Sequence, residues 1–324
     1  MKKSLTMILA VVAAAAVMAG CSGGGKETTA AQAAVAQTAG DAAGTDTTAA
    51  AESVAGTDTT PAPESAAKTD TTATPVSVAG AGITAEQSTP TEQTELLVAA
   101  AASLKNTYEE ELIPMFEAKN PGVTVKGTYD SSGKLQTQIE EGMEADVFMS
   151  AAPKQMNALD EEGMIASDTV TNLLENKIVL IVPSDSKEEF AGFEDIGKAA
   201  SIALGDPASV PVGQYSQEAL TNLGIWDKIQ DKVSFGTNVT EVLSQVAAAS
   251  ADAGIVYATD AYSMADQVKI VAEAPEGSLK KRVIYPVAVV KGTAHEGEAR
   301  AFVDFLQTDE AMKVFESYGF SRGN

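Results

Sequence analysis

Two short stretches carry hydroxyl groups where a predicted strand ends and a predicted helix begins: residues 100–104 (Ala-Ala-Ala-Ser-Leu) and residues 129–133 (Tyr-Asp-Ser-Ser-Gly). Ser103 and Ser132 can each donate from the side-chain O–H and from the backbone N–H. The first turn of a helix has N–H groups without partners in the helix and the positive end of the helix dipole. Two such turns directed at one point would bind an anion without any charged side chain.

Three further positions offer donors of the same neutral kind. Val212 and Val239 each lie at the start of a predicted helix, where a valine can contribute only its backbone amide. Tyr257 ends a predicted strand and offers a phenolic O–H. Any one of these positions is explained by a helix cap or a core contact. Their recurrence at strand ends favours a binding site.

No catalytic or metal-binding arrangement emerges from the sequence. His295 is the only histidine, and its Gly-, Ala- and Glu-rich surroundings predict an exposed loop. There is no G-x-S-x-G motif for a nucleophilic serine and no His and Cys cluster for zinc. The Gly-rich phosphate-binding motifs are also absent. Runs of carboxylates such as residues 109–111 and 160–162 fall on predicted helices as solvent-exposed faces. The sequence therefore predicts a binding protein, not an enzyme, with no metal ligands and no cofactor.

The first 21 residues predict export and anchoring. Lys2 and Lys3 precede an apolar run over residues 5–19, which is too short to span a bilayer and ends at Gly20 and Cys21. Because the single cysteine follows Met18-Ala19-Gly20, the segment resembles a bacterial lipobox; the alternative is an ordinary secretory signal. We expect residues 1–20 to be a lipoprotein signal peptide and Cys21 to be lipidated, which anchors the protein outside the cytoplasm on the bacterial cell membrane. A single cysteine cannot form a disulfide within the chain.

Residues 21–94 are predicted to be a disordered tether. After Cys21 they are dominated by Ala, Thr, Gly, Ser and Pro, contain no aromatic residue, and repeat Thr-Asp-Thr-Thr at residues 45, 57 and 69. Such a composition cannot bury enough apolar surface to fold. A flexible chain of this length would let the folded part range tens of ångströms from the membrane.

The folded part is strongly acidic. Residues 22–94 carry two lysines and nine acidic residues, and Lys2 and Lys3 are positive, so −18 of the total charge of −23 falls on residues 95–324. Nucleic acid binding requires a basic surface, so it is excluded. An anionic ligand would have to be held by local donors against this field.

From residue 96 onward, predicted strands alternate with predicted helices, which is typical of an α/β fold with mostly parallel sheets. Two such series, with long β runs near residues 177 and 285, predict two lobes: residues 95–176 with 281–324, and residues 177–280. In this class the ligand cleft lies at the carboxyl ends of the strands. The polar residues expected there are Ser103, residues 130–133, Ser150, residues 206–213 and residues 257–260. The strands are expected at residues 96–101, 123–129, 145–150, 177–182, 201–204, 233–235, 254–257 and 282–290. The helices are expected at residues 104–116 with an interruption at Pro114, and at 135–139, 153–162, 213–223, 239–249 and 297–318.

Several stretches in one order resemble the molybdate-binding periplasmic component of ABC transporters. They are residues 100–104, Ser-Ser-Gly-Lys-Leu at 131–135, Ala-Asp-Val-Phe-Met-Ser-Ala at 145–151, Gly-Asp-Pro-Ala-Ser-Val-Pro-Val-Gly-Gln-Tyr at 205–215, Gly-Ile-Val-Tyr-Ala-Thr-Asp-Ala at 254–261, Tyr-Pro-Val-Ala-Val-Val at 285–290 and Tyr-Gly-Phe at 318–320. The resemblance covers residues 95–324. It implies a two-lobed, hinge-closing type II binding-protein fold that acts as a monomer and delivers molybdate or tungstate to a membrane permease.

The resemblance also implies which groups hold the oxyanion: the hydroxyls and amides of Ser103 and Ser132, the amides of Val212 and Val239, and the hydroxyl of Tyr257. Two positions depart from the pattern of many members, which have a third serine in place of Gly133 and an alanine in place of Val212. Asp130 is expected to point away from the ligand and to cap the helix that follows it.

Other functions remain open at this point. A binding protein of the same kind could take sulfate, phosphate or another small anion, because ion size decides and the sequence does not reveal the pocket radius. A lipid-anchored hydrolase would need a nucleophile and a base in one cleft. An adhesin or structural lipoprotein would explain the tether but not the hydroxyl-bearing loops.

Overall fold

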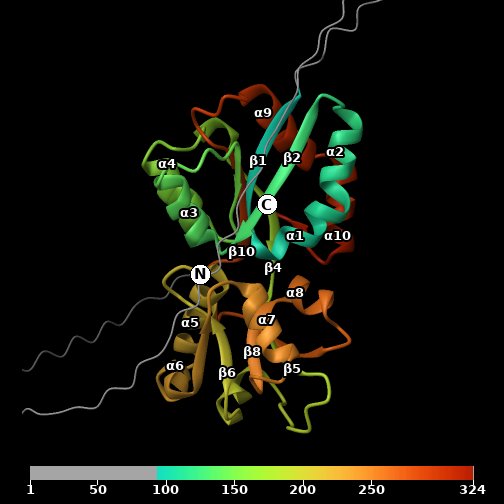
Figure 1. Ribbon diagram of the computed structural model, residues 1–324. Helices are drawn as coiled ribbons and strands as arrows, with labels where there is room; N and C mark the ends of the chain where they lie inside the picture. Colours follow the sequence, from blue (N-terminus) through green and yellow to red (C-terminus); the bar gives the residue numbers. More distant parts are fainter. Residues whose placement is uncertain (1–92, 324) are drawn as a thin grey trace, which may run out of the picture. The chain divides into compact units, whose positions relative to one another are not determined.

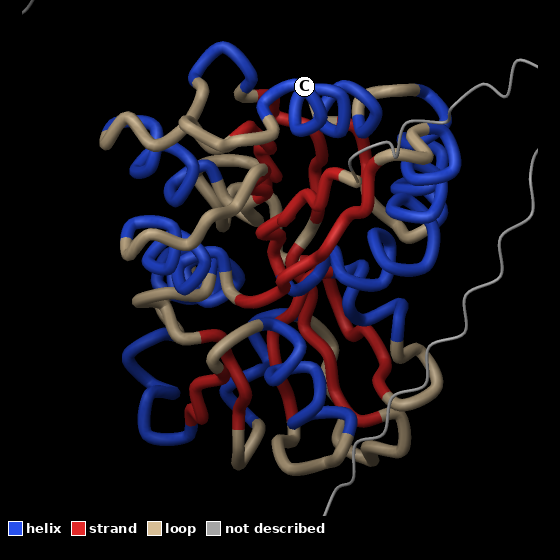
Figure 2. The backbone as a smooth tube through the Cα atoms, turned by 45° about the horizontal axis from the view of Figure 1, so that its top comes forward, coloured by secondary structure: helices blue, strands red, loops and turns tan. Residues whose placement is uncertain are grey.

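The structure is a computed structural model and describes residues 93–323, which belong to one compact unit, Gly82–Asn324. The predicted signal peptide, Cys21 and the predicted tether up to residue 92 lie outside the described residues. Thr94, the last residue of the predicted tether, is the first residue of strand β1 (Thr94–Ala101). The described residues form two lobes, each built on one sheet with helices against it (Figures 1 and 2).

The first lobe contains a six-stranded sheet in the order β11-β4-β10-β3-β1-β2. β1 runs parallel to β2 and β3, whereas β10 runs antiparallel to β3 and β4, and β11 antiparallel to β4. The bounds of the other strands are β2 Val123–Asp130, β3 Val147–Met149, β4 Thr171–Asn176, β10 Val283–Val289 and β11 Ser321–Arg322.

The second lobe contains a five-stranded sheet in the order β7-β6-β8-β5-β9. β6 runs parallel to β7 and β8, and β5 runs antiparallel to β8 and β9. The bounds are β5 Ile178–Pro183, β6 Ile202–Gly205, β7 Val233–Gly236, β8 Ala253–Tyr257 and β9 Val268–Glu273.

The predicted two-lobed α/β fold is confirmed, but both sheets are mixed and not mostly parallel. The parallel pairs come from strand–helix–strand units, which require a crossover helix. The strands next to the connections between the lobes, β4, β5, β9 and β10, pair antiparallel with their neighbours. The chain enters and leaves each lobe through these strands, and their direction is set by the crossing.

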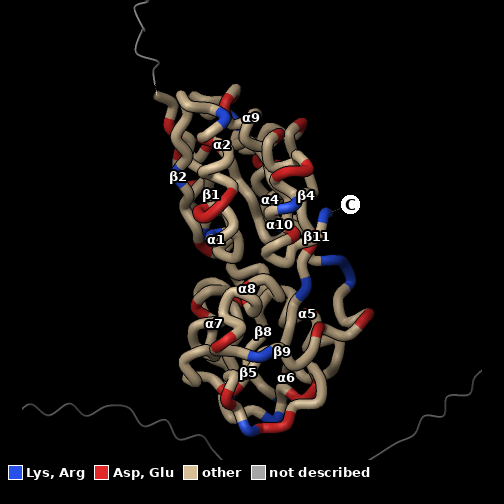
Figure 3. The backbone as a smooth tube through the Cα atoms, turned by 90° about the vertical axis from the view of Figure 1, so that its right-hand side faces the viewer, with Lys and Arg blue, Asp and Glu red and all other residues tan. Residues whose placement is uncertain are grey.

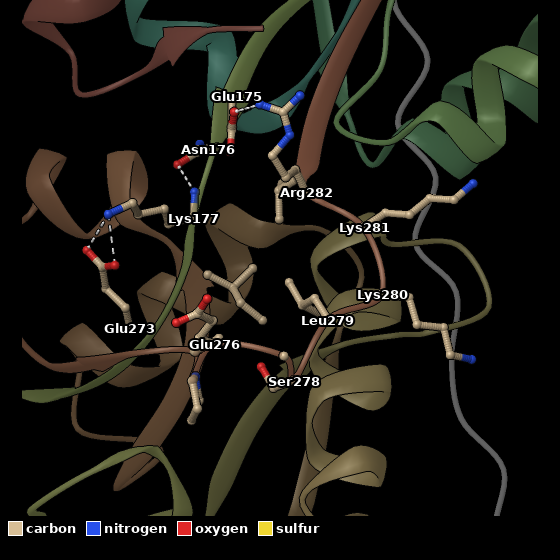
Figure 4. Close-up of a pocket in the computed structure, with 15 residues that line it drawn as sticks. Glu175, Asn176, Lys177, Glu273, Glu276, Ser278, Leu279, Lys280, Lys281 and Arg282 are labelled. Carbon is tan, nitrogen blue, oxygen red and sulfur yellow. Dashed lines mark hydrogen bonds and ion pairs between the residues drawn. The ribbon is translucent and has the colours of Figure 1, made fainter. Parts of the chain in front are cut away.

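Two connections join the lobes, and we call them the hinge: residues 176–177 between β4 and β5, and residues 274–282 between β9 and β10. Ion pairs flank them, from Lys177 to Glu273 at 2.8 Å and from Arg282 to Glu175 at 2.7 Å (Figure 4). Side chains this exposed contribute little to stability. A cavity of about 430 Å³ lies between the two connections.

Helices cover both faces of the first sheet, with α3 and α4 on one side and α2, α9 and α10 on the other (Figure 1). In the second lobe α5 and α7 both pack against β6 and β8. The helices described by the structure have the bounds α1 Lys105–Thr107, α2 Ile113–Lys119, α3 Ser132–Glu140, α4 Pro153–Glu161, α5 Pro211–Asn222, α6 Trp226–Ile229, α7 Val239–Ala247, α8 Ala258–Ser263, α9 Glu296–Leu306 and α10 Asp309–Ser317. The 3₁₀ turns are η1 Ala102–Leu104, η3 Ser167–Thr169, η4 Phe193–Lys198 and η5 Gln230–Lys232.

The interruption predicted at Pro114 takes the form of a π-helix, η2 (Tyr108–Leu112), directly before α2. Proline cannot donate a helical hydrogen bond, and its ring clashes with the carbonyl four residues earlier. The wider π turn accommodates this without ending the helical segment. The helical segment therefore stays continuous from Ala102 to Lys119.

Alternation along the strands divides the first lobe into two cores. Ala99 and Phe148 face α3 and α4, where Leu135 and Leu159 pack against them. Their neighbours on the strands face the other side, where the aromatic rings include Tyr108, Phe116, Phe302 and Phe315. Because successive strand residues point to opposite faces of a sheet, the sequence determines which residues enter which of the two cores.

Five elements have no counterpart among the expected strands and helices: β4, β9, β11, α6 and α8. β9 is an edge strand with largely exposed residues, and β11 has two residues, so neither produces a strong hydrophobic pattern. None of the helices within residues 93–323 is long and apolar enough to cross a membrane.

Candidate functional site

The structure brings all five predicted donor residues to one small cavity between the lobes. Its volume is about 10 Å³, against about 430 Å³ for the cavity at the hinge. A cavity of this size suits a small group. The cavity is lined from the first lobe by Ala101, Ala102, Ser103, Asp130, Ser131, Ser132 and Ala151, and from the second lobe by Val210, Pro211, Val212, Val239 and Tyr257.

Each of the five residues lies where a strand leads into a helical turn. Ser103 is in η1 after β1, and Ser132 is the first residue of α3 after β2. Val212 is the second residue of α5, and Val239 is the first residue of α7. Tyr257 ends β8 and precedes α8. The amides of Val212 and Val239 therefore belong to first turns, whose N–H groups have no partner within the helix.

The hydroxyl of Ser132 is held so that its proton is free to donate. Ser132 is fully buried, and its Oγ accepts a hydrogen bond of 2.9 Å from the amide of Ala151. Because that bond uses a lone pair of the oxygen, the O–H can be directed elsewhere. Ser103 Oγ lies 3.0 Å from the hydroxyl of Tyr285.

Tyr257 presents a buried donor that no described residue accepts from. The residue is 1% exposed, and its hydroxyl has no hydrogen-bond partner within residues 93–323. Burial raises the pKa of Tyr257 well above its usual value, and the neighbouring Tyr285 adds to this, so the phenol stays protonated. An unsatisfied buried donor costs about 1–3 kcal/mol, which a ligand acceptor in the cavity would recover.

No Lys, Arg or His is among the residues that line the cavity, and the only charged one is Asp130. The expectation that Asp130 caps α3 is wrong. The cap is Ser131, whose Oγ accepts from the amide of Lys134, because that oxygen is one residue nearer to the first turn. Asp130 Oδ1 accepts from the amide of Ser131 at 2.7 Å, from Lys134 Nζ at 3.4 Å and from Asn238 Nδ2 at 3.3 Å. These donors offset its charge.

The lobes are in direct contact around the cavity. The amide of Gly133 donates to the carbonyl of Ser209 at 2.9 Å, which joins the two backbones. The Asn238–Asp130 hydrogen bond also crosses between the lobes, as does a bond of 3.4 Å from Gln155 Nε2 to Gln214 Oε1. The structure is therefore in a closed arrangement.

Five of the polar residues expected at the cleft do not line this cavity: Ser150, Asp206, Ser209, Thr259 and Asp260. The hydroxyl of Ser150 bonds to the carbonyl of Ala152 within its own turn. Asp206 accepts from the amide of Ala208 in the loop before α5. Asp260 is buried on α8, and its Oδ2 has no hydrogen-bond partner within the described residues.

The buried carboxyl of Asp260 is expected to make the stability of the fold depend on pH. Burial raises the pKa of this carboxyl from 3.8 to about 7. Between these two pH values the folded chain binds more protons than the unfolded chain, so stability falls as the pH rises and the loss is complete above about pH 7. The cost is on the order of 4 kcal/mol. We expect Asp260→Asn to unfold at a higher temperature than the wild type at pH 8 and to show a smaller decline between pH 5 and pH 8.

Asp266→Asn is the matched control, because Asp266 is an exposed aspartate three residues beyond the end of α8. Thermal unfolding followed by circular dichroism at each pH measures both variants. Parallel pH profiles for the wild type and Asp260→Asn would show that Asp260 does not carry the effect.

The histidine lies far from these donors. His295 Nδ1 is 3.3 Å from Asp146, and both residues line a different cavity with Glu95, at the end of the sheet where β1 begins. The cleft thus holds no histidine base for Ser103 or Ser132, which removes the basis for a hydrolase. Across residues 93–323, no group of three or more His, Cys, Asp or Glu side chains is placed to hold a metal ion.

Acidic residues are distributed over both lobes, and a run of basic residues, Lys280 to Arg282, lies on the hinge (Figure 3). In Figure 4 the side chains of Lys280 and Lys281 extend away from the other labelled residues of the hinge cavity. Neither residue lines the cavity between the lobes. The basic run therefore does not supply charge to the site.

Comparisons with known proteins show which family this fold belongs to. A family profile described as bacterial extracellular solute-binding protein matches residues 96–321. YvgL of Bacillus subtilis is 42% identical over 74% of this chain and 92% of its own length. The molybdate-binding protein ModA of Haemophilus influenzae is 40% identical over 70% of this chain and 90% of its own.

A solved structure agrees with these matches. The periplasmic molybdate-binding protein of Azotobacter vinelandii aligns with a TM-score of 0.61 and 26% identity, over 69% of this chain and 98% of that protein. The relatives of the present chain are solute-binding proteins and not enzymes. On the evidence of a profile match over nearly all described residues and of relatives at 40% identity or more, the chain belongs to the family of bacterial extracellular solute-binding proteins.

Proposed function

We propose that this protein captures molybdate or tungstate in the cavity between its lobes, as the solute-binding component of an ABC importer. The observation that carries the proposal is the buried, unpartnered hydroxyl of Tyr257, which lines the same small cavity as Ser103 and Ser132. Relatives of this chain at 37% and 40% identity are molybdate-binding proteins.

The chemistry of the donors supports an oxyanion. Fixed dipoles that replace the water around an anion stabilise it without a counter-ion, most strongly where water is excluded. Three hydroxyls and the first-turn amides surround the cavity from both lobes. An anion that accepts from both lobes at once binds the closed state only, so it shifts the population toward closure.

The same donors favour an anion that carries no proton. A protonated oxyanion, such as hydrogen phosphate, brings an O–H that needs an acceptor. Asp130 is the only carboxylate that lines the cavity, and donors already contact both of its oxygens: three reach Oδ1, and Lys134 Nζ lies 3.5 Å from Oδ2. A fully deprotonated oxyanion has acceptors only, which matches a site lined by donors.

The proposal includes anchoring outside the cytoplasm. Cys21 ends a segment that resembles a lipobox, and the relative YvgL is described as a lipoprotein. We propose that a lipidated Cys21 holds the protein at the membrane, that residues 22–94 act as a flexible tether, and that the closed form docks on a membrane permease as a monomer. The lobes in this proposal are residues 95–176 with 281–324, and residues 177–280.

Calorimetric titration of the purified chain with molybdate, tungstate, sulfate and phosphate tests the function. We expect molybdate and tungstate to bind one ion per chain, and sulfate and phosphate to bind at least tenfold more weakly. Thermal unfolding should show the same order, because a ligand stabilises the folded state by RT ln(1 + [L]/Kd).

Two results would count against the proposal. Binding of phosphate or sulfate as tight as that of molybdate would identify a binding protein for another anion. The absence of heat and of thermal stabilisation with all four ions would remove the oxyanion function altogether.

A further inference from the structure

A chain of buried side-chain hydrogen bonds runs from the hinge to the cavity. Asn176 is the last residue of β4, and its Nδ2 lies 3.0 Å from Thr259 Oγ1 and 3.3 Å from the hydroxyl of Tyr285. Tyr285, on β10, lies 3.0 Å from Ser103 Oγ. Asn176, Thr259 and Tyr285 are all buried, so water does not replace these partners.

The side chain of Asn176 indicates which groups donate in this series of hydrogen bonds. The amide of Lys177 donates to Asn176 Oδ1 at 2.8 Å, as the dashed line in Figure 4 shows, and this identifies the oxygen of the side-chain amide. The other end of Asn176 is therefore an NH₂ group, which only donates. Tyr285 accepts one of these N–H bonds, which leaves its own proton free to be donated to Ser103 Oγ.

Tyr285 is suited to the role of a neutral donor. Burial raises the pKa of Tyr285 well above its usual value, with a smaller contribution from Asp260, so the hydroxyl keeps its proton. Its ring is fixed by edge contacts with Tyr257 and Phe320, at 5.5 Å between ring centroids in both pairs. The ring can thus hold the hydroxyl in one place.

We propose that Tyr285 is a positioning residue that sets the selectivity of the site, by donating to Ser103 Oγ and so directing the Ser103 proton at the ligand. The proposal rests on the proposed oxyanion function and deepens it. With one lone pair of Ser103 Oγ taken by Tyr285 and the Ser103 proton directed into the cavity, the O–H of a protonated oxyanion would face a donor and not an acceptor. Asn176 supports this direction from the hinge, because its N–H donates to the Tyr285 oxygen and leaves the Tyr285 proton for Ser103.

The test replaces Tyr285 with phenylalanine, which keeps the ring and removes the hydroxyl. In Tyr285→Phe the Ser103 oxygen is free to accept, and its O–H is no longer oriented. We expect molybdate affinity to fall about fivefold to tenfold, as for the loss of one hydrogen bond. Phosphate, which carries a proton near neutral pH, should lose less affinity or gain some. The preference for molybdate over phosphate, measured by competition calorimetry, should therefore narrow.

Tyr108→Phe is the matched control. Tyr108 is also fully buried in the first lobe, and its hydroxyl donates to the sulfur of Met149, away from the cavity. This variant should keep both the affinity and the preference of the wild type. Asn176→Asp is a second variant, which replaces the donor by an acceptor and draws the Tyr285 proton away from Ser103; we expect a larger loss of molybdate affinity than in Tyr285→Phe.

The outcomes distinguish a failure of the proposed function from a failure of the role proposed for Tyr285. If the wild type titrates with no oxyanion, the proposed function is wrong and this inference falls with it. If the wild type binds molybdate, and Tyr285→Phe folds with an unchanged preference for molybdate over phosphate, the inference alone is wrong. An equal loss of affinity for all anions would likewise overturn it, because that would be a structural effect.

Discussion

Gly133→Ala is expected to lower molybdate affinity about 10²-fold while leaving the chain as stable as the wild type. A Cβ at Gly133 would overlap the carbonyl oxygen of Ser209 and lie 2.8 Å from its Cα, so the lobes could not close to the distance seen here. The direct Gly133–Ser209 hydrogen bond would be lost, and donors of the second lobe would be displaced from the ligand. Together these losses amount to about 3 kcal/mol.

The stability of this variant should not fall, because Gly133 is the second residue of α3 and alanine is favoured over glycine in a helix by up to about 1 kcal/mol. Gly297→Ala is a closely matched control. Gly297 is likewise the second residue of its helix, α9, and nothing lies within 4 Å of where its Cβ would be. Calorimetry should find the wild-type affinity in Gly297→Ala. Equal affinities in both variants would show that closure does not bring Gly133 against Ser209 when the ligand is bound.

Replacing both Ser103 and Ser132 with alanine is expected to reduce molybdate affinity at least 10²-fold. Each hydroxyl lines the cavity, and a hydrogen bond to a charged group contributes about 1.5–3 kcal/mol, or roughly tenfold to a hundredfold in affinity. The two residues lie on separate turns, η1 and α3. We therefore expect each single variant to show part of the loss of molybdate affinity seen in the double variant.

Ser278→Ala is the control for the double variant. Ser278 is also buried, but it lines the hinge cavity and its hydroxyl has no partner within the described residues. It should bind molybdate as the wild type does. An unchanged affinity in the double Ser103 and Ser132 variant, measured by calorimetry beside this control, would show that the two hydroxyls do not hold the ligand.

Much of the fold was predictable from hydrophobic patterns. Buried strands such as β1 and β5 are continuous apolar runs, and α3 and α7 carry their apolar residues at helical spacing. The edge strands β9 and β11 were missed because their residues are largely exposed. Strand directions next to the hinge were also missed, because they depend on where the chain crosses between lobes and not on any local pattern.

The candidate site shows the same division. The five donor residues were predicted from strand ends and from family resemblance, and the structure places all five on one cavity. The Gly133–Ser209 contact and the Asn176–Tyr285–Ser103 chain were not predicted, since they join residues 76 and up to 182 positions apart. The capping role of Asp130 was predicted wrongly, because the side chain of Ser131 caps α3. The hydrogen bond of Asp130 with Asn238 was not predicted, because Asn238 comes from the other lobe.

The sequence by itself determined which groups could hold an anion, because donor chemistry belongs to residue types and to the first turns of helices. It also determined the alternation of strands and helices that places those turns at strand ends. Only the tertiary structure decided how the groups meet. The size of the cavity depends on contacts between the lobes, and the direction of the Ser103 hydroxyl depends on its contact with Tyr285 of β10 within the first lobe. The charge of Asp130 is offset by donors of its own lobe and by Asn238 of the other. No local sequence pattern contains the geometry of these contacts.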